Sequence, residues 1–152
     1  MKPWMSGVFV LLVILSVALG CSSGDGLNRA QVKGEVKVDG LPLEEGSINF
    51  FPAGTAEGPS AGGVIEQGKY DLPRERGPVA GPNRVEIRGV KKTGRMVPNA
   101  MAPGTMREEL VEALPGEYNT KSTLVREIAP GENVVDFNDL KGVTLSTKKD
   151  AP

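Results

Sequence analysis

The sequence predicts an all-β fold, namely a single antiparallel β-sandwich of about seven strands. Two observations predict it. Short segments alternate apolar with polar residues, and connections rich in Gly and Pro separate those segments. Two parts of the chain are exceptions: an apolar N-terminal segment that is typical of a signal peptide, and one short segment with helical spacing.

The first half of the expected sandwich has the clearest strands. Val32, Val36 and Val38 alternate with charged residues, which indicates a strand with one buried face. The dipeptides Asp39-Gly40 and Gln67-Gly68 are expected to form turns, because Gly accepts positive φ without steric cost. Further strands are expected at residues 47–51, 64–66, 70–72 and 84–90, with the inward-facing side chains Phe50, Val85 and Ile87.

The second half is expected to end in a hairpin. Strands at residues 123–128 and 134–137 are joined by "APGEN", and Pro followed by Gly in a short connection favours a hairpin turn. Arg126 interrupts the apolar face of the first of these strands, which places that strand at a sheet edge.

Residues 91–114 form a long connection between the two groups of strands. Within it, "TMREELVEAL" at residues 105–114 combines a capping box with apolar residues at helical spacing, and Pro115 follows. We therefore expect one short helix inside a long loop. A loop of this length is either functional, for example as a lid, or disordered.

The N-terminus predicts export and lipid attachment. The apolar run after Lys2 is short for a membrane-spanning helix and ends in "ALGC" at Cys21, the single cysteine of the chain. This sequence resembles the lipobox of bacterial lipoproteins. The resemblance implies that a diacylglycerol alkylates the Cys21 thiol, that cleavage occurs just before it, and that the new N-terminus is acylated. Ser22, in place of Asp, favours the outer membrane over the inner one by the same resemblance. The alternative is an ordinary secretory peptide with an incidental Cys.

Four regions follow from these assignments: a lipoprotein signal peptide at residues 1–20, a lipidated flexible tether at 21–30, the sandwich at 31–140, and a polar C-terminal tail at 141–152. Removing 20 of 152 residues leaves 132, which is enough for one domain. The net charge of the whole chain is −1, and no basic cluster predicts a nucleic-acid partner. The expected partners are membrane lipid, through acylated Cys21, and an envelope protein or polysaccharide.

The residue types that are missing limit the chemistry. The chain has no His and one Cys, which excludes His-dependent catalytic triads, His-based zinc sites and intramolecular disulfides. Glu44-Glu45 and Glu108-Glu109 could supply an acid and a base, although adjacent acidic residues are typical of a solvated face. "DFNDL" at residues 136–140 offers oxygen ligands but lacks the spacing of a calcium loop. We therefore predict no catalytic residue, cofactor or metal, and no enzymatic activity.

The densest run of hydrogen-bonding side chains comes after Pro115 and contains Tyr118, Asn119, Thr120, Lys121 and Ser122. It is either a binding cluster or a structural one. The structural interpretation is preferred, because such side chains commonly satisfy main-chain groups where a loop returns to a sheet.

Several motifs resemble one known family. The opening residues Val32, Gly34, Val36, Asp39, Gly40, Pro42 and Leu43, followed by Gly68 and Tyr70, are similar to the carboxypeptidase regulatory-like, or transthyretin-like, β-sandwich family. Asn83 departs from that pattern, which usually has Tyr at this position. The resemblance spans residues 31–140 and implies a transthyretin-like sandwich that is usually non-catalytic. It carries no catalytic residue to this chain.

The sequence thus predicts a lipid-anchored, non-enzymatic cell-envelope module with a binding or structural role. Two alternatives remain open. One is an enzyme, or an accessory to an enzyme, that acts on envelope polysaccharide through carboxylates. The other is a carrier or receptor for a small ligand, with residues 91–114 as its lid.

Overall fold

The computed structural model describes residues 26–143, and this part of the chain is mostly antiparallel β-sheet. Cys21, the signal peptide, the first half of the tether and most of the polar tail lie outside the described residues. Within residues 26–143, no helix is long and apolar enough to cross a membrane. The elements are β1 Gln31–Val38, β2 Leu41–Pro42, β3 Glu45–Pro52, β4 Ala61–Glu66, β5 Lys69–Leu72, η1 Arg74–Arg76, β6 Gly81–Pro98, β7 Met106–Glu112, η2 Gly116–Tyr118, β8 Val125–Ile128, β9 Glu132–Val134 and β10 Phe137–Leu140.

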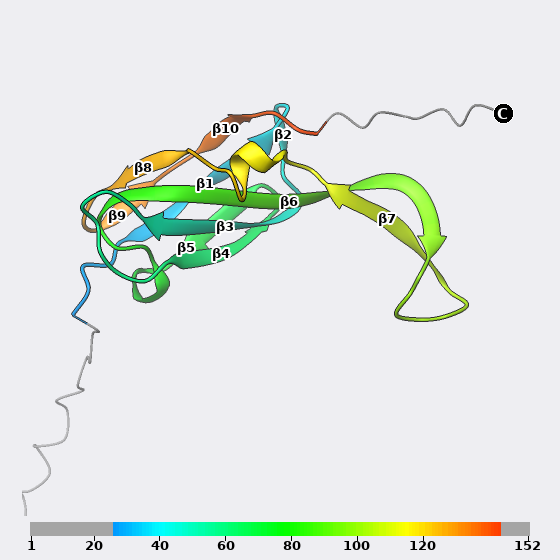
Figure 1. Ribbon diagram of the computed structural model, residues 1–152, viewed down its shortest axis with the longest axis horizontal. Coiled ribbons are helices and arrows are strands. Elements are labelled where there is room, and N and C mark those ends of the chain that lie inside the picture. The colour runs from blue at the N-terminus through cyan, green and yellow to red at the C-terminus, as the bar shows by residue number, and fades with distance from the viewer. Residues whose placement is uncertain (1–25, 144–152) are drawn as a thin grey trace, which may run out of the picture.

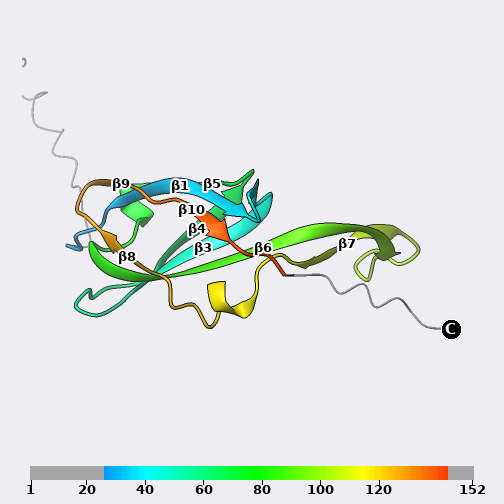
Figure 2. The same ribbon diagram turned by 90° about the horizontal axis from the view of Figure 1, so that it is seen from above.

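The strands form one sheet in the order β10-β1-β5-β4-β3-β6-β7, with β2 and β9 also paired to β1 and β8 paired to β6. The sheet curls into two layers, with β1 and β5 above β3 and β6 in Figure 2. The rings of Phe50 on β3 and Tyr70 on β5 lie 6.3 Å apart across the interior, although β4 separates these strands. The Arg126 guanidinium on β8 lies 5.0 Å from the ring of Phe137 on β10, so the two ends of the curled sheet approach each other.

The core lies between the two layers. The expected inward positions Phe50, Val85 and Ile87 are fully buried, as is Val32 on β1, and these predictions are confirmed. The alternation of apolar and polar residues produces this arrangement, because successive strand side chains point to opposite faces.

Both expected Gly-containing turns are confirmed. Asp39 and Gly40 have φ of 52° and 81° and reverse the chain between β1 and β2. Gln67 and Gly68 have φ of 52° and 76° and join β4 to β5. Two successive residues with positive φ match the right-handed twist of the flanking strands.

The expected C-terminal hairpin is wrong. The strand β8 begins at Val125 and pairs with β6, whereas β9 and β10 pair with β1, and both do so in parallel. The "APGEN" connection therefore leads from one end of the curled sheet to the other. The side chain of Asn133 stabilises it, by accepting from the Ala129 N–H and donating to the Ala129 carbonyl. The prediction that Arg126 lies on an edge strand is confirmed, because β8 pairs with β6 alone within the described chain.

The expected helix at residues 105–114 is also wrong, and residues 91–114 are not a structureless loop. The strand β6 continues to Pro98, and β7 returns antiparallel to it. The Thr105 hydroxyl, expected to cap the helix, donates instead to the Ala102 carbonyl. The apolar residues of β7 do have helical spacing, but pairing with β6 outweighs the weak propensity of a helix this short.

Candidate functional site

The β6–β7 hairpin is the most distinctive feature of the molecule. Beyond Val90, which still pairs with Glu45 of β3, the strand β6 pairs with β7 alone. Residues 90–112, called the ribbon from here on, extend well beyond the curled body of the protein (Figure 1). The ribbon points away from the body and does not fold back over it, so in this structure it covers no sheet edge as a lid would.

One face of the ribbon is largely apolar. Cross-strand partners share a face, and the register places Met96 beside Glu108, Pro98 beside Met106, and Lys92 beside Leu110. Met96, Met106 and Leu110 are 54%, 55% and 41% exposed, and Met101 at the tip is 97% exposed. We call Met96, Pro98, Met106 and Leu110 the apolar face. Scattered exposed apolar residues are common, but a row of them along a projecting element is typical of an interaction surface.

The opposite face of the ribbon carries Val97 and Val111 together with a set of polar side chains that pair with one another. An Arg95 nitrogen lies 2.6 Å from a Glu109 carboxylate oxygen, and the Thr93 hydroxyl donates to the other oxygen at 3.0 Å. The hydrogen bond from Arg95, followed by that from Thr93, lowers the pKa of Glu109. Where the ribbon leaves the body, the Lys91 ammonium donates to the Val143 carbonyl. These contacts fix the opposite face and leave the apolar face open.

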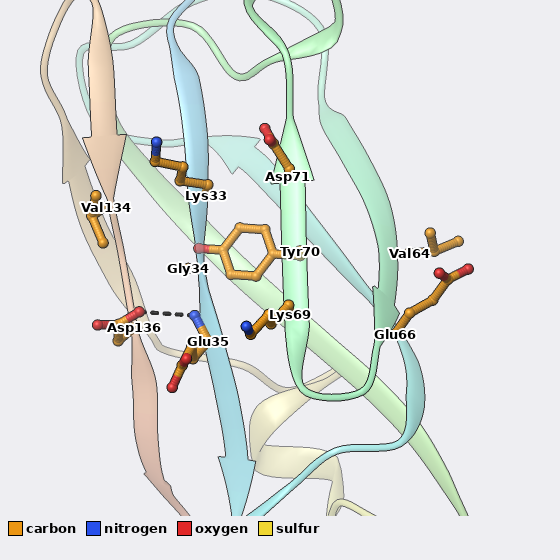
Figure 3. A pocket seen from close by; sticks show the side chains of 10 residues that line it. All are labelled: Lys33, Gly34, Glu35, Val64, Glu66, Lys69, Tyr70, Asp71, Val134 and Asp136. Atoms are coloured by element: carbon orange, nitrogen blue, oxygen red, sulfur yellow. Dashed lines mark hydrogen bonds between the residues drawn. The ribbon is translucent and has the colours of Figure 1, made fainter.

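A second candidate surface is a hollow of about 610 Å³ on the outer side of β1, β4 and β5 (Figure 3). Its lining includes Val134 and Asp136, which flank Val135 in the short connection between β9 and β10. There the Val135 carbonyl accepts from the Tyr70 hydroxyl at 2.6 Å, and the Asp136 carboxylate accepts from the Glu35 N–H at 2.8 Å. The lack of a side chain at Gly34 makes room for Val135, since a Cβ at residue 34 would overlap the Val135 carbonyl.

Four of the polar side chains around this hollow, those of Tyr70, Asp136, Asp71 and Glu35, have partners within the protein. The Tyr70 phenol is buried, and burial followed by the negative charge of Asp136 raises its pKa, so it stays protonated and is not available as a base. Asp71 accepts a long hydrogen bond from Gln31, and Glu35 pairs with Lys37. The hollow therefore offers mixed charges on an open surface and no activated group.

The carboxylate pairs singled out in the sequence do not form an acid–base pair in this geometry. Glu108 and Glu109 are neighbours on one strand, so their side chains point to opposite faces of the ribbon. Glu44 and Glu45 are exposed at the start of β3. Among residues 26–143, no three acidic, His or Cys side chains are placed to hold a metal ion.

The segment from Tyr118 to Ser122 lies beside the core. Ser122 and Asn119 are buried; the Ser122 hydroxyl donates to the Val85 carbonyl and accepts from the Leu124 N–H. The Asn119 side chain accepts from the Thr120 N–H at 2.6 Å and has a long contact of 3.5 Å with the Leu114 carbonyl. The Tyr118 hydroxyl accepts from the Lys141 N–H at 3.3 Å.

The side chains of this segment do not converge on one point. Thr120 and Lys121 are exposed, while Asn119 and Ser122 bond to the main chain. These contacts are the kind expected of a structural role.

Comparisons with other proteins do not extend this picture. No family model, curated protein or solved structure matches the chain. The expected resemblance to transthyretin-like domains therefore stays a prediction from the sequence motifs.

The sequence singled out residues 91–114 as a lid or a disordered loop, but not as a projecting hairpin with an apolar face. The local pattern of Met106–Glu112 gave no strand signal, because its apolar residues are Met106, Leu110 and Val111, a spacing that favours a helix. What no local pattern could supply was the length of β6, an 18-residue strand that carries β7 away from the body.

Proposed function

We propose that this chain is a lipid-anchored, non-enzymatic module of the bacterial cell envelope that binds an envelope protein through the ribbon. The observation that carries the proposal is the ribbon itself, a projecting hairpin with Met96, Met106 and Leu110 exposed on one face. The expected lipobox at Cys21 supports the anchor, and the transthyretin-like motifs support a sandwich as the body. The proposed location is the outer membrane.

The positions of the two ends support a partner beyond the lipid surface. The chain enters the body at Gln31, at the end opposite the ribbon (Figure 1). A lipid on Cys21 would hold that end near the membrane through a tether of about ten residues, which spans at most about 36 Å when fully extended. The ribbon is then at the end of the described chain opposite the attachment point, where it can reach an envelope protein beyond the lipid surface.

Three observations support the non-enzymatic part of this proposal. The chain contains no His, and the adjacent glutamates of β7 point to opposite faces. The buried Tyr70 hydroxyl is bonded to a main-chain carbonyl. The geometry therefore gives the carboxylate-based alternative no particular support.

The lipid anchor is tested by labelling cells with radioactive palmitate. We expect label on the native chain and on a Ser22→Ala control, and loss of label on Cys21→Ala. Equal labelling of the native chain and Cys21→Ala would show that lipid is not attached through Cys21.

The binding role is tested by photo-crosslinking in cells from single positions. A photoreactive residue at Met101, on the ribbon tip, is compared with one at Val64, which is 66% exposed on the body. We expect a discrete crosslinked protein from position 101 and none from position 64. Crosslinks from position 64 alone would place the binding surface on the body instead.

A further inference from the structure

The outer edge of β7 is a sheet edge without a partner strand. Within the described chain, β7 pairs with β6 and with no other strand. A two-stranded hairpin by itself is only marginally stable in water, and an unpaired edge is a template for another strand. The part of the ribbon beyond Val90 has neither a third strand nor a core beneath it.

The hydrogen-bonding pattern of the ladder shows which main-chain groups face outward. The Ala113 N–H donates to the Gly89 carbonyl at one end, and the Asn99 N–H donates to the Thr105 carbonyl at the other. Inward- and outward-pointing residues alternate along an antiparallel strand. Odd-numbered residues of β7 therefore point toward β6, and the N–H and C=O groups of Met106, Glu108, Leu110 and Glu112 point outward.

The side chains of those same four residues lie on the apolar side of the ribbon. A strand added to this edge would thus bond to their main-chain groups and place its alternate side chains beside theirs. Met106 and Leu110 favour apolar neighbours, and Glu108 and Glu112 favour basic ones. The edge therefore presents two apolar and two acidic positions in alternation.

Charge disfavours a second copy of this chain as the added strand. The strand β7 contains three glutamates and one arginine. Antiparallel pairing of two copies brings these acidic strands together, and like charges that face each other across strands are destabilising. Moreover, Glu109 is already paired with Arg95, which leaves it less able to pair with the Arg107 of another copy.

We propose that the partner adds an extended segment to the outer edge of β7, an inference that rests on the proposed binding function. In that segment, basic residues face Glu108 and Glu112, and apolar residues face Met106 and Leu110. The main-chain bonds supply affinity, and the alternation of apolar and basic side chains supplies specificity. The added strand also gives the ribbon the third strand that it lacks.

The probe for this proposal is a synthetic seven-residue peptide designed to run antiparallel to β7. It has lysine opposite Glu112 and Glu108, leucine opposite Leu110 and valine opposite Met106; the positions between them are valine, threonine and threonine. One control peptide has glutamate in place of both lysines. A second is N-methylated at the residues opposite Leu110 and Glu108, which removes two donors to the edge while keeping every side chain.

Binding is measured by fluorescence anisotropy with the full chain. We expect saturable binding of the probe, and binding about tenfold weaker for each control peptide, because each control loses two favourable cross-strand contacts of about 0.7 kcal/mol apiece. Amide hydrogen exchange in the presence of the probe should slow at Glu108 and Leu110. Equal affinity for the probe and the N-methylated peptide would overturn the proposal.

Two variants of the chain test the edge directly. Leu110→Pro removes an outward N–H without removing a bond to β6, and Glu108→Lys reverses one charge. Both should weaken probe binding about tenfold. The matched control Glu127→Lys, on an exposed position of β8, should leave it unchanged. Faster exchange of the Val111 amide in Leu110→Pro would show that this variant disrupts the ribbon. In that case, binding of the probe to Glu108→Lys alone tests whether the edge is the docking site.

Failure of this inference is distinguishable from failure of the proposed function. If the crosslink from position 101 persists undiminished in Glu108→Lys and Leu110→Pro, the edge is not the docking site, although the ribbon still binds a partner. If the chain sediments as a dimer and Glu108→Lys strengthens that dimer, a second copy is the occupant of the edge, and the proposal is wrong.

Discussion

Replacing Gly34 with alanine would test how the two ends of the chain are held together. A methyl group at residue 34 would overlap the Val135 carbonyl oxygen and lie 2.7 Å from the Val135 carbonyl carbon. Neither group can move freely, because residue 34 lies in β1 and Val135 lies in main chain between β9 and β10. The segment that joins β9 to β10 must therefore move away from β1.

The cost can be worked out from the contacts that this movement breaks. The Tyr70 hydroxyl donates to the Val135 carbonyl at 2.6 Å, the Val135 N–H donates to the Lys33 carbonyl at 2.9 Å, and the Glu35 N–H donates to the Asp136 carboxylate at 2.8 Å. Each such bond contributes about 1 kcal/mol net. Loss of all three lowers the free energy of unfolding by about 3 kcal/mol.

The assay is urea unfolding of Gly34→Ala beside Gly63→Ala. Residue 63 is in β4 of the same sheet, and a Cβ there would lie 3.4 Å from the nearest Leu72 carbon, which is an ordinary contact. We expect Gly63→Ala to remain within about 1 kcal/mol of the native chain, because alanine also restricts the unfolded state. If the two variants were equally stable, close approach of Val135 would not be the reason for glycine at residue 34.

Three further predictions concern single side chains. Tyr70→Phe removes the bond to Val135 and should lower the free energy of unfolding by about 1–2 kcal/mol. Because burial raises the pKa of Tyr70, the native chain should lose stability as the pH rises above about 10, where the unfolded tyrosine ionises; Tyr70→Phe should lose less over that range in alkaline melts. Ser122→Ala leaves the Val85 carbonyl and the Leu124 N–H unsatisfied, so unfolding by urea should become easier by about 1–3 kcal/mol, while crosslinking from position 101 stays unchanged. Pairing with Arg95 lowers the pKa of Glu109, so protonation of this carboxylate as the pH falls below about 4.5 should loosen the ribbon. Amide exchange, corrected for the intrinsic exchange rate at each pH, should then become faster in the ribbon relative to the body. Glu109→Gln should remove that acid dependence.

These predictions would fail in different ways. An identical alkaline profile for the native chain and Tyr70→Phe would mean that the phenol is not protected from ionisation. A Ser122→Ala variant of native stability that had lost the crosslink would turn the segment from Tyr118 to Ser122 into a binding cluster. Ribbon exchange that did not respond to acid would show that the Arg95–Glu109 pair does not stabilise the ribbon.

Local sequence patterns predicted the parts of the fold that local chemistry decides. Alternation in β1, β3 and β6 identified Val32, Phe50 and Val85 as buried. The Asp39-Gly40 and Gln67-Gly68 turns followed from the tolerance of Gly for positive φ. Gly34, recognised only as part of a motif, has a physical reason in the structure, since the Val135 carbonyl occupies the space where its side chain would lie.

Long-range pairing decided the rest and was not predictable from local patterns. The short strands β9 and β10 pair in parallel with β1, which lies about 100 residues earlier in the chain. No local sequence pattern encodes such a pairing. The apolar residues of Met106–Glu112 have helical spacing, and it is pairing with the long β6 beside it that makes this segment a strand. The candidate surface was missed for the same reason, because an apolar face exists only once the two strands are paired.

The central claim is that the ribbon is the partner-binding element. The most direct test of this claim uses a chain in which the ribbon is shortened. Lys91 and Val111 are cross-strand partners whose main-chain groups face each other, so residues 92–110 can be replaced by Asn-Gly, a dipeptide that closes two-residue hairpins. The shortened and native chains are then crosslinked in intact envelopes and purified side by side. We predict equal palmitate labelling, melting temperatures within a few degrees of each other, and loss of the partner protein from the shortened chain alone. Recovery of the same partner in equal amount from both chains would contradict the account.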